Sequence, residues 1–107
     1  MLALKRAVQA VRSTAEIKRY AVDLVRATRG APHVALGASP RASLALNHAA
    51  QALALFEGRD YVVPDDIQAL AVPVIAHRLG LDPQARFGGV TAEAIVGEIL
   101  RSVPVPA

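Results

Sequence analysis

Residues 37–46, with the sequence GASPRASLAL, contain the side chains of this chain whose types and spacing best suit a defined chemistry. Ser39 followed by Pro40 predicts the start of a helix. The serine hydroxyl can accept a hydrogen bond from a free amide, and proline has no amide to leave unpaired at the first helical position. Arg41 then falls in the first helical turn, at the positive end of the helix dipole, where an acidic residue is normally favoured. A cation at this position therefore calls for a negative partner.

Two kinds of partner could satisfy Arg41. One is a carboxylate elsewhere on the surface of the same chain, which would make this arginine structural. The other is an anion from outside the chain, because the free amides of a helix N-terminus and a guanidinium fork together suit a phosphate oxygen. The sequence contains no G-x-x-x-x-G-K-[ST] phosphate loop. The rest of such a phosphate site would have to lie on another domain.

The remaining polar residues predict no catalytic group and no metal site. His33, His48 and His77 are too dispersed in the sequence to form an H-x-x-x-H pair of metal ligands, and we expect each to be structural or exposed. Asp65 and Asp66 follow a proline and open a helix. We therefore interpret this acidic pair as a helix-dipole and solvation feature.

Composition indicates a single small domain. The chain has 107 residues, of which 53% are apolar and 4% aromatic, so we expect a core of alanine, leucine, valine and isoleucine. Its 12 basic residues are scattered, and its net charge of +3 gives little reason to expect a nucleic-acid partner. No apolar segment is long enough to span a bilayer, so no membrane partner is expected. The absence of cysteine excludes disulfides and thiolate chemistry, and it agrees with a cytoplasmic location.

Apolar periodicity predicts an all-α fold, a small bundle of about four to five helices with short extended pieces between them. The helical segments are residues 1–12, 13–29, 40–57, 64–79 (broken) and 91–102, followed by a tail at residues 103–107. The segment 40–57 is apolar around well over half of its circumference, which is typical of a central helix with neighbours on several sides. Short extended pieces are expected at residues 34–36 and 61–63.

Capping signals predict the boundaries of the first long helix and the central one. Ser13 and Glu16 have the spacing of a capping box at the start of the helix 13–29. Gly30 is expected as the residue that ends this helix, and Gly58 as the one that ends the central helix.

Prolines and a threonine predict the boundaries in the second half of the chain. Pro64 suits the first position of a helix, whereas Pro73 should break that helix and leave a second short turn over residues 73–79. Residues 80–89 are interpreted as a turn-rich connector with hairpin character. Thr91 is expected to cap the last helix.

Four segments in this order closely resemble the C-terminal helical lid of MoxR-type AAA+ ATPases: YAVDLVRATR, LGASPRASLAL, AAQALALFEGRDYVVPDDIQALA and VIAHRL. The likeness extends over about residues 2–106, and the motifs G-A-S-P-R-A and G-R-D-Y-V-x-P-D-D are specific when they occur together. The resemblance implies that Arg41 is the sensor 2 arginine, which reaches from the lid to the phosphates of ATP held by the preceding core. Ser39 and Pro40 would lie beside this contact.

The resemblance also implies what the whole protein would do. ATP and Mg²⁺ would be bound by an α/β core that is absent from this sequence, so the chain alone is not expected to hydrolyse ATP, and we interpret it as an excised lid. The parent is expected to form a ring, a hexamer in the family pattern, and to act like a chaperone on client proteins that the sequence does not identify. Val63 departs from the family, which often has a threonine there, so a hydroxyl cap before Pro64 is lost.

Two other interpretations remain open at this stage. The segment ALALFEGRDYVVPDDIQALA has the long-helix, strand-loop and acidic-helix order of a histone fold, which would predict a tight dimer and salt-dependent DNA binding. The early helix start at residues 37–40 and the break at Pro73 argue against it. A standalone helical protein-interaction module is the other alternative.

Overall fold

The computed structural model describes the backbone of residues 2–106 and the side chains of residues 6–106. Over these residues the chain forms a helical bundle with a small antiparallel sheet of two strands, which confirms the predicted all-α class. The elements in chain order are α1 (Leu2–Ala10), α2 (Ala15–Arg29), β1 (Val34–Leu36), α3 (Arg41–Phe56), α4 (Pro64–Ile75), the 3-10 helix η1 (Ala76–Arg78), β2 (Gly80–Leu81), α5 (Pro83–Phe87) and α6 (Ala92–Ser102).

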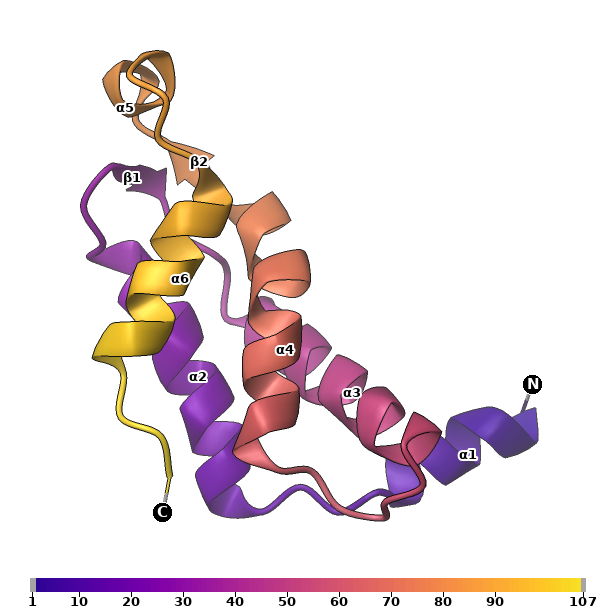
Figure 1. The fold of residues 1–107 in the computed structure, drawn as a ribbon. Helices are drawn as coiled ribbons and strands as arrows, with labels where there is room; N and C mark the ends of the chain where they lie inside the picture. The colour runs from indigo at the N-terminus through magenta and orange to yellow at the C-terminus, as the bar shows by residue number, and fades with distance from the viewer. Residues whose placement is uncertain (1, 107) are drawn as a thin grey trace.

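Four helices form the body of the molecule and carry its core. Helices α2, α3, α4 and α6 pack together. Helix α1 extends from one end of α3, and the segment with β1, β2 and α5 projects at the opposite end of the molecule (Figure 1). The described chain measures 46 × 32 × 21 Å. Its radius of gyration is 14.5 Å, against roughly 13 Å for a compact domain of this length. The two projections account for this excess.

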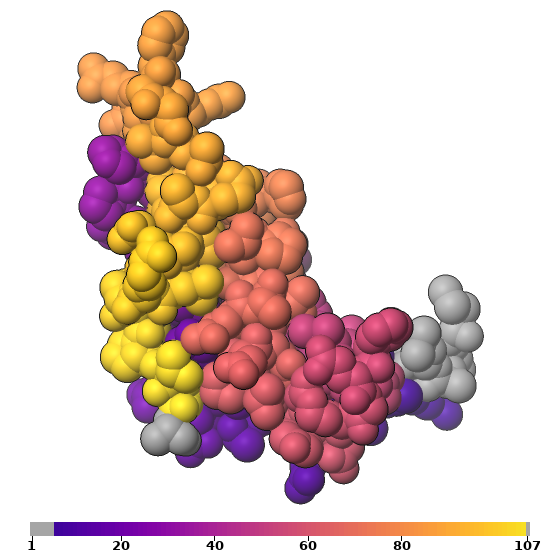
Figure 2. Space-filling view, in the orientation of Figure 1, coloured from indigo at the N-terminus to yellow at the C-terminus, as the bar shows by residue number. Residues whose placement is uncertain are grey.

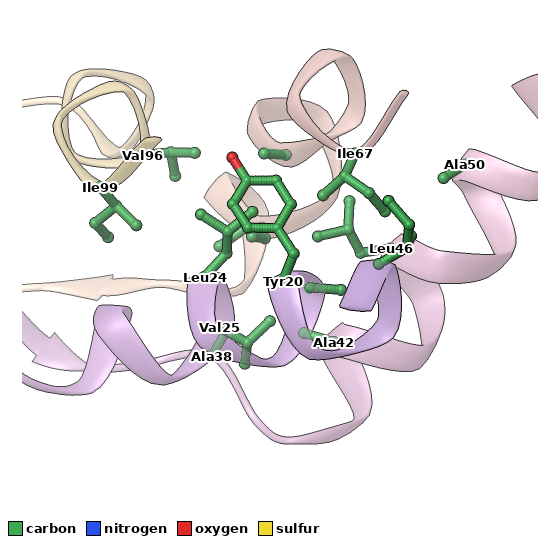
Figure 3. Packing of buried hydrophobic residues seen from close by; sticks show 14 of the residues in the cluster. Tyr20, Leu24, Val25, Ala38, Ala42, Leu46, Ala50, Ile67, Val96 and Ile99 are labelled. Carbon is green, nitrogen blue, oxygen red and sulfur yellow. The ribbon is translucent and has the colours of Figure 1, made fainter. Parts of the chain in front are cut away.

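The core is built from aliphatic side chains around one tyrosine, as the composition predicts. Tyr20, Leu24, Leu46, Ile67 and Val96 are among the largest fully buried side chains (Figure 3). Helix α3 adds a line of buried alanines, whose small side chains let the neighbouring helices approach closely.

Helix α3 is central to the fold, but it is not enclosed on every side. It packs against α1, α2 and α4. These neighbours on several sides confirm the prediction of a central helix, although Leu44 is 63% exposed and Phe56 is 89% exposed.

The start of α2 differs by one residue from the prediction. Thr14, not Ser13, caps the helix, because its Oγ1 accepts a hydrogen bond of 3.3 Å from the Ile17 amide. Arg12 exchanges backbone hydrogen bonds with the segment before α4, which keeps the chain extended there. The Ser13 hydroxyl instead donates to Asn47 Oδ1 on α3 at 2.6 Å. The predicted capping box of Ser13 and Glu16 is therefore wrong.

The glycines after α2 and α3 behave differently. Gly58 has a φ of +80°, the left-handed conformation expected of a glycine that ends a helix, and α3 stops just before it. Gly30 follows α2 as predicted, but with a φ of −106° it does not use its freedom to turn left-handed. His33 takes the positive φ in that connection, at 71°.

Helix α4 continues through Pro73 to Ile75 and passes directly into η1, so the predicted break at the proline is wrong. Proline removes one helical hydrogen bond, that to the carbonyl of Ala69. Pro73 and Ala69 are both exposed, so water can satisfy that carbonyl. The helix therefore tolerates the proline and tightens only at Ala76–Arg78.

The connector before α6 is not a hairpin. Gly80–Leu81 pairs antiparallel with Val34–Leu36, far away in the sequence. A one-turn helix, α5, follows it, and Asp82 caps this helix by accepting a 3.0 Å hydrogen bond from the Gln84 amide. The strand predicted at residues 34–36 is present, whereas the extended piece at residues 61–63 forms only a single bridge at Tyr61.

Helix α6 begins as predicted, because Thr91 Oγ1 accepts from the Ala94 amide at 3.2 Å. Its buried face is formed by Ile95, Val96 and Ile99. A non-helical tail follows over residues 103–106, while Met1 and Ala107 lie outside the described residues. None of the described helices has the length and apolar character needed to cross a membrane.

Candidate functional site at the start of helix α3

Arg41 is the first residue of α3, and its side chain is exposed. The ion pairs within residues 6–106 are Arg59 with Glu57, Arg59 with Asp66, and Arg101 with Glu98. None of the carboxylates described there pairs with Arg41. Of the two partners considered for this arginine, a carboxylate of the same chain is therefore not found among the described residues.

Ser39 and Pro40 start the helix in a different way from the predicted one. Pro40 has helical dihedral angles, φ −55° and ψ −26°, although the hydrogen-bonded helix is counted from Arg41. The Ala42 amide bonds to the backbone carbonyl of Ser39 at 2.9 Å, and the Ser43 amide bonds to that of Pro40 at 3.2 Å. Because this tight first turn satisfies these amides with backbone oxygens, the predicted cap by the Ser39 hydroxyl is wrong. Ser39 itself is exposed.

The loop before Arg41 is fixed to the end of α2. The Ala38 amide donates a 3.0 Å hydrogen bond to the hydroxyl of Thr28, which in turn donates to the Val25 carbonyl at 2.6 Å. Thr28 and Ala38 are both buried, and Ala38 belongs to the main apolar cluster (Figure 3). A side chain on Gly37 would place its Cβ 2.9 Å from the Arg29 Cα, so only glycine allows this close approach.

The sequence patterns did not single out Thr28 or its contact with the loop. The one signal in the sequence was the hydroxyl group of Thr28 itself. A hydroxyl on an apolar face must find a hydrogen-bond partner, because burying it without one is costly. Its partner, the Ala38 amide, could not be identified without the packing of the loop on the helix.

The surroundings of this loop are positively charged. A hollow of about 580 Å³ beside it is lined by Arg29, Arg78 and residues 36–40, and a smaller one of about 190 Å³ includes Arg26. No carboxylate lines either hollow, and Arg41 lines neither of them. Clustered positive charge of this kind attracts anions to the start of α3.

The second motif, G-R-D-Y-V-V-P-D-D, forms a structural cluster. Arg59 donates to both carboxylate oxygens of Asp66, at 2.7 and 2.8 Å, and Asp66 also accepts from the Val63 amide at 2.9 Å. Asp66 is only 3% exposed. The interpretation of the acidic pair as a solvated feature is therefore wrong for Asp66, while Asp65 is exposed as expected.

The protonation equilibria of this cluster follow from its geometry. Burial acts to raise the pKa of the Asp66 carboxyl, but the hydrogen bonds from Arg59 and the Val63 amide, with the charge of Arg59, outweigh burial and lower it. The hydrogen bonds to Asp66 and Glu57 raise the pKa of the Arg59 guanidinium. The cluster holds the end of α3 to the start of α4, and the Arg59 guanidinium in it is already paired with Asp66 and Glu57.

The three histidines do not come together in the structure. His33, His48 and His77 are all exposed and lie on different elements. Among the described residues, no group of three or more histidine, cysteine, aspartate or glutamate side chains could hold a metal ion.

Comparison with known proteins identifies the fold that presents Arg41. Residues 26–99, more than half of the chain, match the AAA lid domain family. The chain belongs to this family. It is 55% identical over 103 residues to the uncharacterized protein YeaC of Bacillus subtilis, covering 96% of this chain. It is 44% identical over 73 residues, 68% of this chain, to the chaperone MoxR1 of Mycobacterium tuberculosis.

A solved structure shows the same arrangement of helices. The crystal structure of a candidate ATPase from Cytophaga hutchinsonii superposes on 95% of this chain with a TM-score of 0.90, at 32% sequence identity. Together with the MoxR relative, this match supports the assignment of the chain as the lid of a MoxR-type AAA+ ATPase. It also favours a lid over the histone-fold-like and standalone alternatives.

The AAA lid covers only part of these relatives. The chain spans 32% of the length of YeaC, 19% of MoxR1 and 34% of the Cytophaga protein. The activity and partners of a whole ATPase therefore do not follow from the match alone.

Proposed function

We propose that this AAA lid contacts ATP, held with Mg²⁺ by an AAA+ core, through Arg41 acting as sensor 2. One observation carries the proposal. Arg41 is exposed at the first residue of α3, on a loop fixed to the core of the lid, and it has no carboxylate partner among the described residues. The exposed Ser39 and Pro40 lie beside it and complete the surface that faces the nucleotide.

The residues present fit a phosphate group but not a metal ion. An exposed arginine at the positive end of a helix dipole is favourable for phosphate oxygens, and the neighbouring hollows carry further arginines without carboxylates. No metal-binding group occurs among the described residues, so the proposal assigns Mg²⁺ to the core. When bound there, ATP supplies the γ-phosphoryl group for transfer to water.

The contribution of the lid is electrostatic and positional. The Arg41 guanidinium donates charge-assisted hydrogen bonds to phosphate oxygens and stabilises the negative charge that develops on them during hydrolysis. Because α3 is packed into the lid and its first turn is fixed, little ordering of the backbone is needed when the contact forms. Loss of the contact frees the lid to move against the core.

This movement would pass the nucleotide state to neighbouring subunits. In the proposal the parent forms a ring, a hexamer by the resemblance, and works in the cytoplasm as a chaperone-like remodelling protein. A lid that is held by phosphate in one state and released in the next is a two-state element of the kind that couples hydrolysis to larger motions. Client proteins would be acted on by the whole assembly.

The test is the turnover of the full-length ATPase that carries this lid. Arg41→Ala should lower the rate of ATP hydrolysis by about 100-fold or more, the usual cost of removing a charge-stabilising group from a transition state. Arg101→Ala is the matched control, because Arg101 is an exposed arginine whose ion pair among the described residues is with Glu98 on α6. It should leave turnover unchanged. Near-normal hydrolysis by the Arg41→Ala protein would defeat the proposal.

A further inference from the structure

Thr28 is a buried polar side chain whose hydrogen bonds link the body of the lid to the loop before Arg41. It lies in the last turns of α2 and is fully buried. Its hydroxyl donates to the Val25 carbonyl at 2.6 Å and accepts from the Ala38 amide at 3.0 Å. The first bond fixes the rotamer of the threonine, and the second fixes the position of the loop backbone.

The loop is confined from a second direction by Gly37. A Cβ at this position would meet the Arg29 Cα at 2.9 Å and the Arg29 nitrogen at 3.0 Å, so the loop backbone lies directly on the end of α2. Ala38 is buried next, and Ala42 fixes the first turn of α3 in the core. Ser39, Pro40 and Arg41 are thus exposed residues between two buried anchors.

We propose that Thr28 is a positioning residue for Arg41. By holding the Ala38 amide it sets where the first turn of α3 begins and hence where the Arg41 guanidinium can reach. The inference rests on the proposed sensor 2 function and adds to it a residue outside the exposed motif. Without the hydroxyl, the Ala38 amide is buried and unsatisfied, so the loop must shift to let water reach it.

The first experiment compares two substitutions in the full-length ATPase. Thr28→Val keeps the shape of the side chain and removes both hydrogen bonds, and it should lower turnover about 10-fold, because small misplacements of a catalytic group are costly. Thr28→Ser keeps the hydroxyl and should restore turnover to near the wild-type value. A Thr28→Val enzyme with wild-type turnover would overturn the inference.

The second experiment separates positioning from a general structural effect. If Thr28 acts through Arg41, the double variant Thr28→Val, Arg41→Ala should be no slower than Arg41→Ala alone. If the double variant instead shows the product of the two single-variant losses in turnover, Thr28 acts independently of Arg41, and the inference is overturned. Normal turnover of Arg41→Ala would instead overturn the proposed function itself, and the two failures are therefore distinguishable.

A direct readout of the loop accompanies the kinetics. In the 107-residue chain, amide hydrogen exchange at Ala38 should be about 10-fold faster in Thr28→Val than in the wild type, with little change for amides in the middle of α2. Unchanged exchange at Ala38 would contradict the inference. If Thr28→Val does not fold, Gly37→Ala replaces it, because its Cβ displaces the loop from the other side. Gly37→Ala should then lower turnover in the wild-type background but not in the Arg41→Ala background. A further loss of turnover in the Arg41→Ala background would overturn the inference.

Discussion

At the scale of single residues, the two motif arginines of the lid have opposite environments. Arg59 donates to Asp66, Glu57 and the Tyr61 carbonyl. Arg41 is exposed and has no such carboxylate among the described residues. An arginine whose donors are already paired within the chain stabilises the fold, whereas a free guanidinium at a helix N-terminus is available to bind a ligand. This contrast separates the structural motif from the one proposed to bind a ligand.

Asp66 should contribute to stability and Asp65 should not. Asp66→Ala removes the bonds to Arg59 and to the Val63 amide at the start of α4, and it should lower the free energy of unfolding by about 1–2 kcal/mol. Asp65→Ala, a change of the same kind in the same helical turn, should cost less than about 0.5 kcal/mol. Urea unfolding of both variants checks this, and equal losses would contradict the assigned role of Asp66.

The same residue predicts a pH dependence. The pKa of Asp66 is lowered in the folded state, so the unfolded chain binds more protons between that pKa and the ordinary value of about 3.9. Its contribution is therefore fully present above about pH 4 and is lost as the pH falls through the lowered pKa. The stability difference between wild type and Asp66→Asn should shrink when urea unfolding is repeated from about pH 6 down to about pH 3.

At the scale of elements, two glycines with different backbone conformations should respond oppositely to alanine. Gly58 ends α3 with φ +80°, so Gly58→Ala should destabilise the chain by about 1 kcal/mol. Gly97 lies inside α6, where an added Cβ would meet only the end of the Arg101 side chain at 4.0 Å. Gly97→Ala should stabilise by about 0.5–1 kcal/mol. Thermal unfolding would decide, and stabilisation by Gly58→Ala would refute the left-handed cap.

The sequence was sufficient to predict elements whose cause is local. The helix that begins after Thr91 and the stop at Gly58 follow from side chains within a few positions of each boundary. The sequence was insufficient where an element depends on a partner that is far away along the chain. The cap of α2 moved to Thr14 because Ser13 bonds to Asn47, and β2 exists because β1 lies beside it. Local patterns contain no information about such partners.

The residues of the candidate site also differ in whether the sequence alone draws attention to them. Ser39 and Pro40 are prominent because they are typical of a helix start, and Arg41 is prominent because a cation in the first turn is unusual. Thr28 is ten positions away from its partner, the Ala38 amide, and reads as one more residue of an apolar stripe. The exposed residues of the site could therefore be predicted from the sequence, whereas the buried residue that holds them required the packed structure.

At the scale of the whole molecule, the lid consists of a packed body with the fully buried core and an arm whose Val34 and Leu81 are only partly buried against that core. The arm, formed by β1, β2 and α5, stands out from the body in the space-filling view (Figure 2). Phe87 at the end of α5 is 97% exposed. Since hydrophobic stabilisation follows the apolar area removed from water, the stability of the lid must come from the body.

This division predicts the response to losing a large apolar side chain from each part. Phe87→Ser should change the free energy of unfolding by less than about 0.5 kcal/mol, because the ring makes almost no buried contact. Ile67→Ala, in the core between α4 and its neighbours, should cost about 2–5 kcal/mol, since it removes a fully buried side chain and leaves a cavity. Urea unfolding of the 107-residue chain measures both. A large loss from Phe87→Ser would mean that the arm folds back onto the body in solution, and the extended shape of the lid would then be wrong.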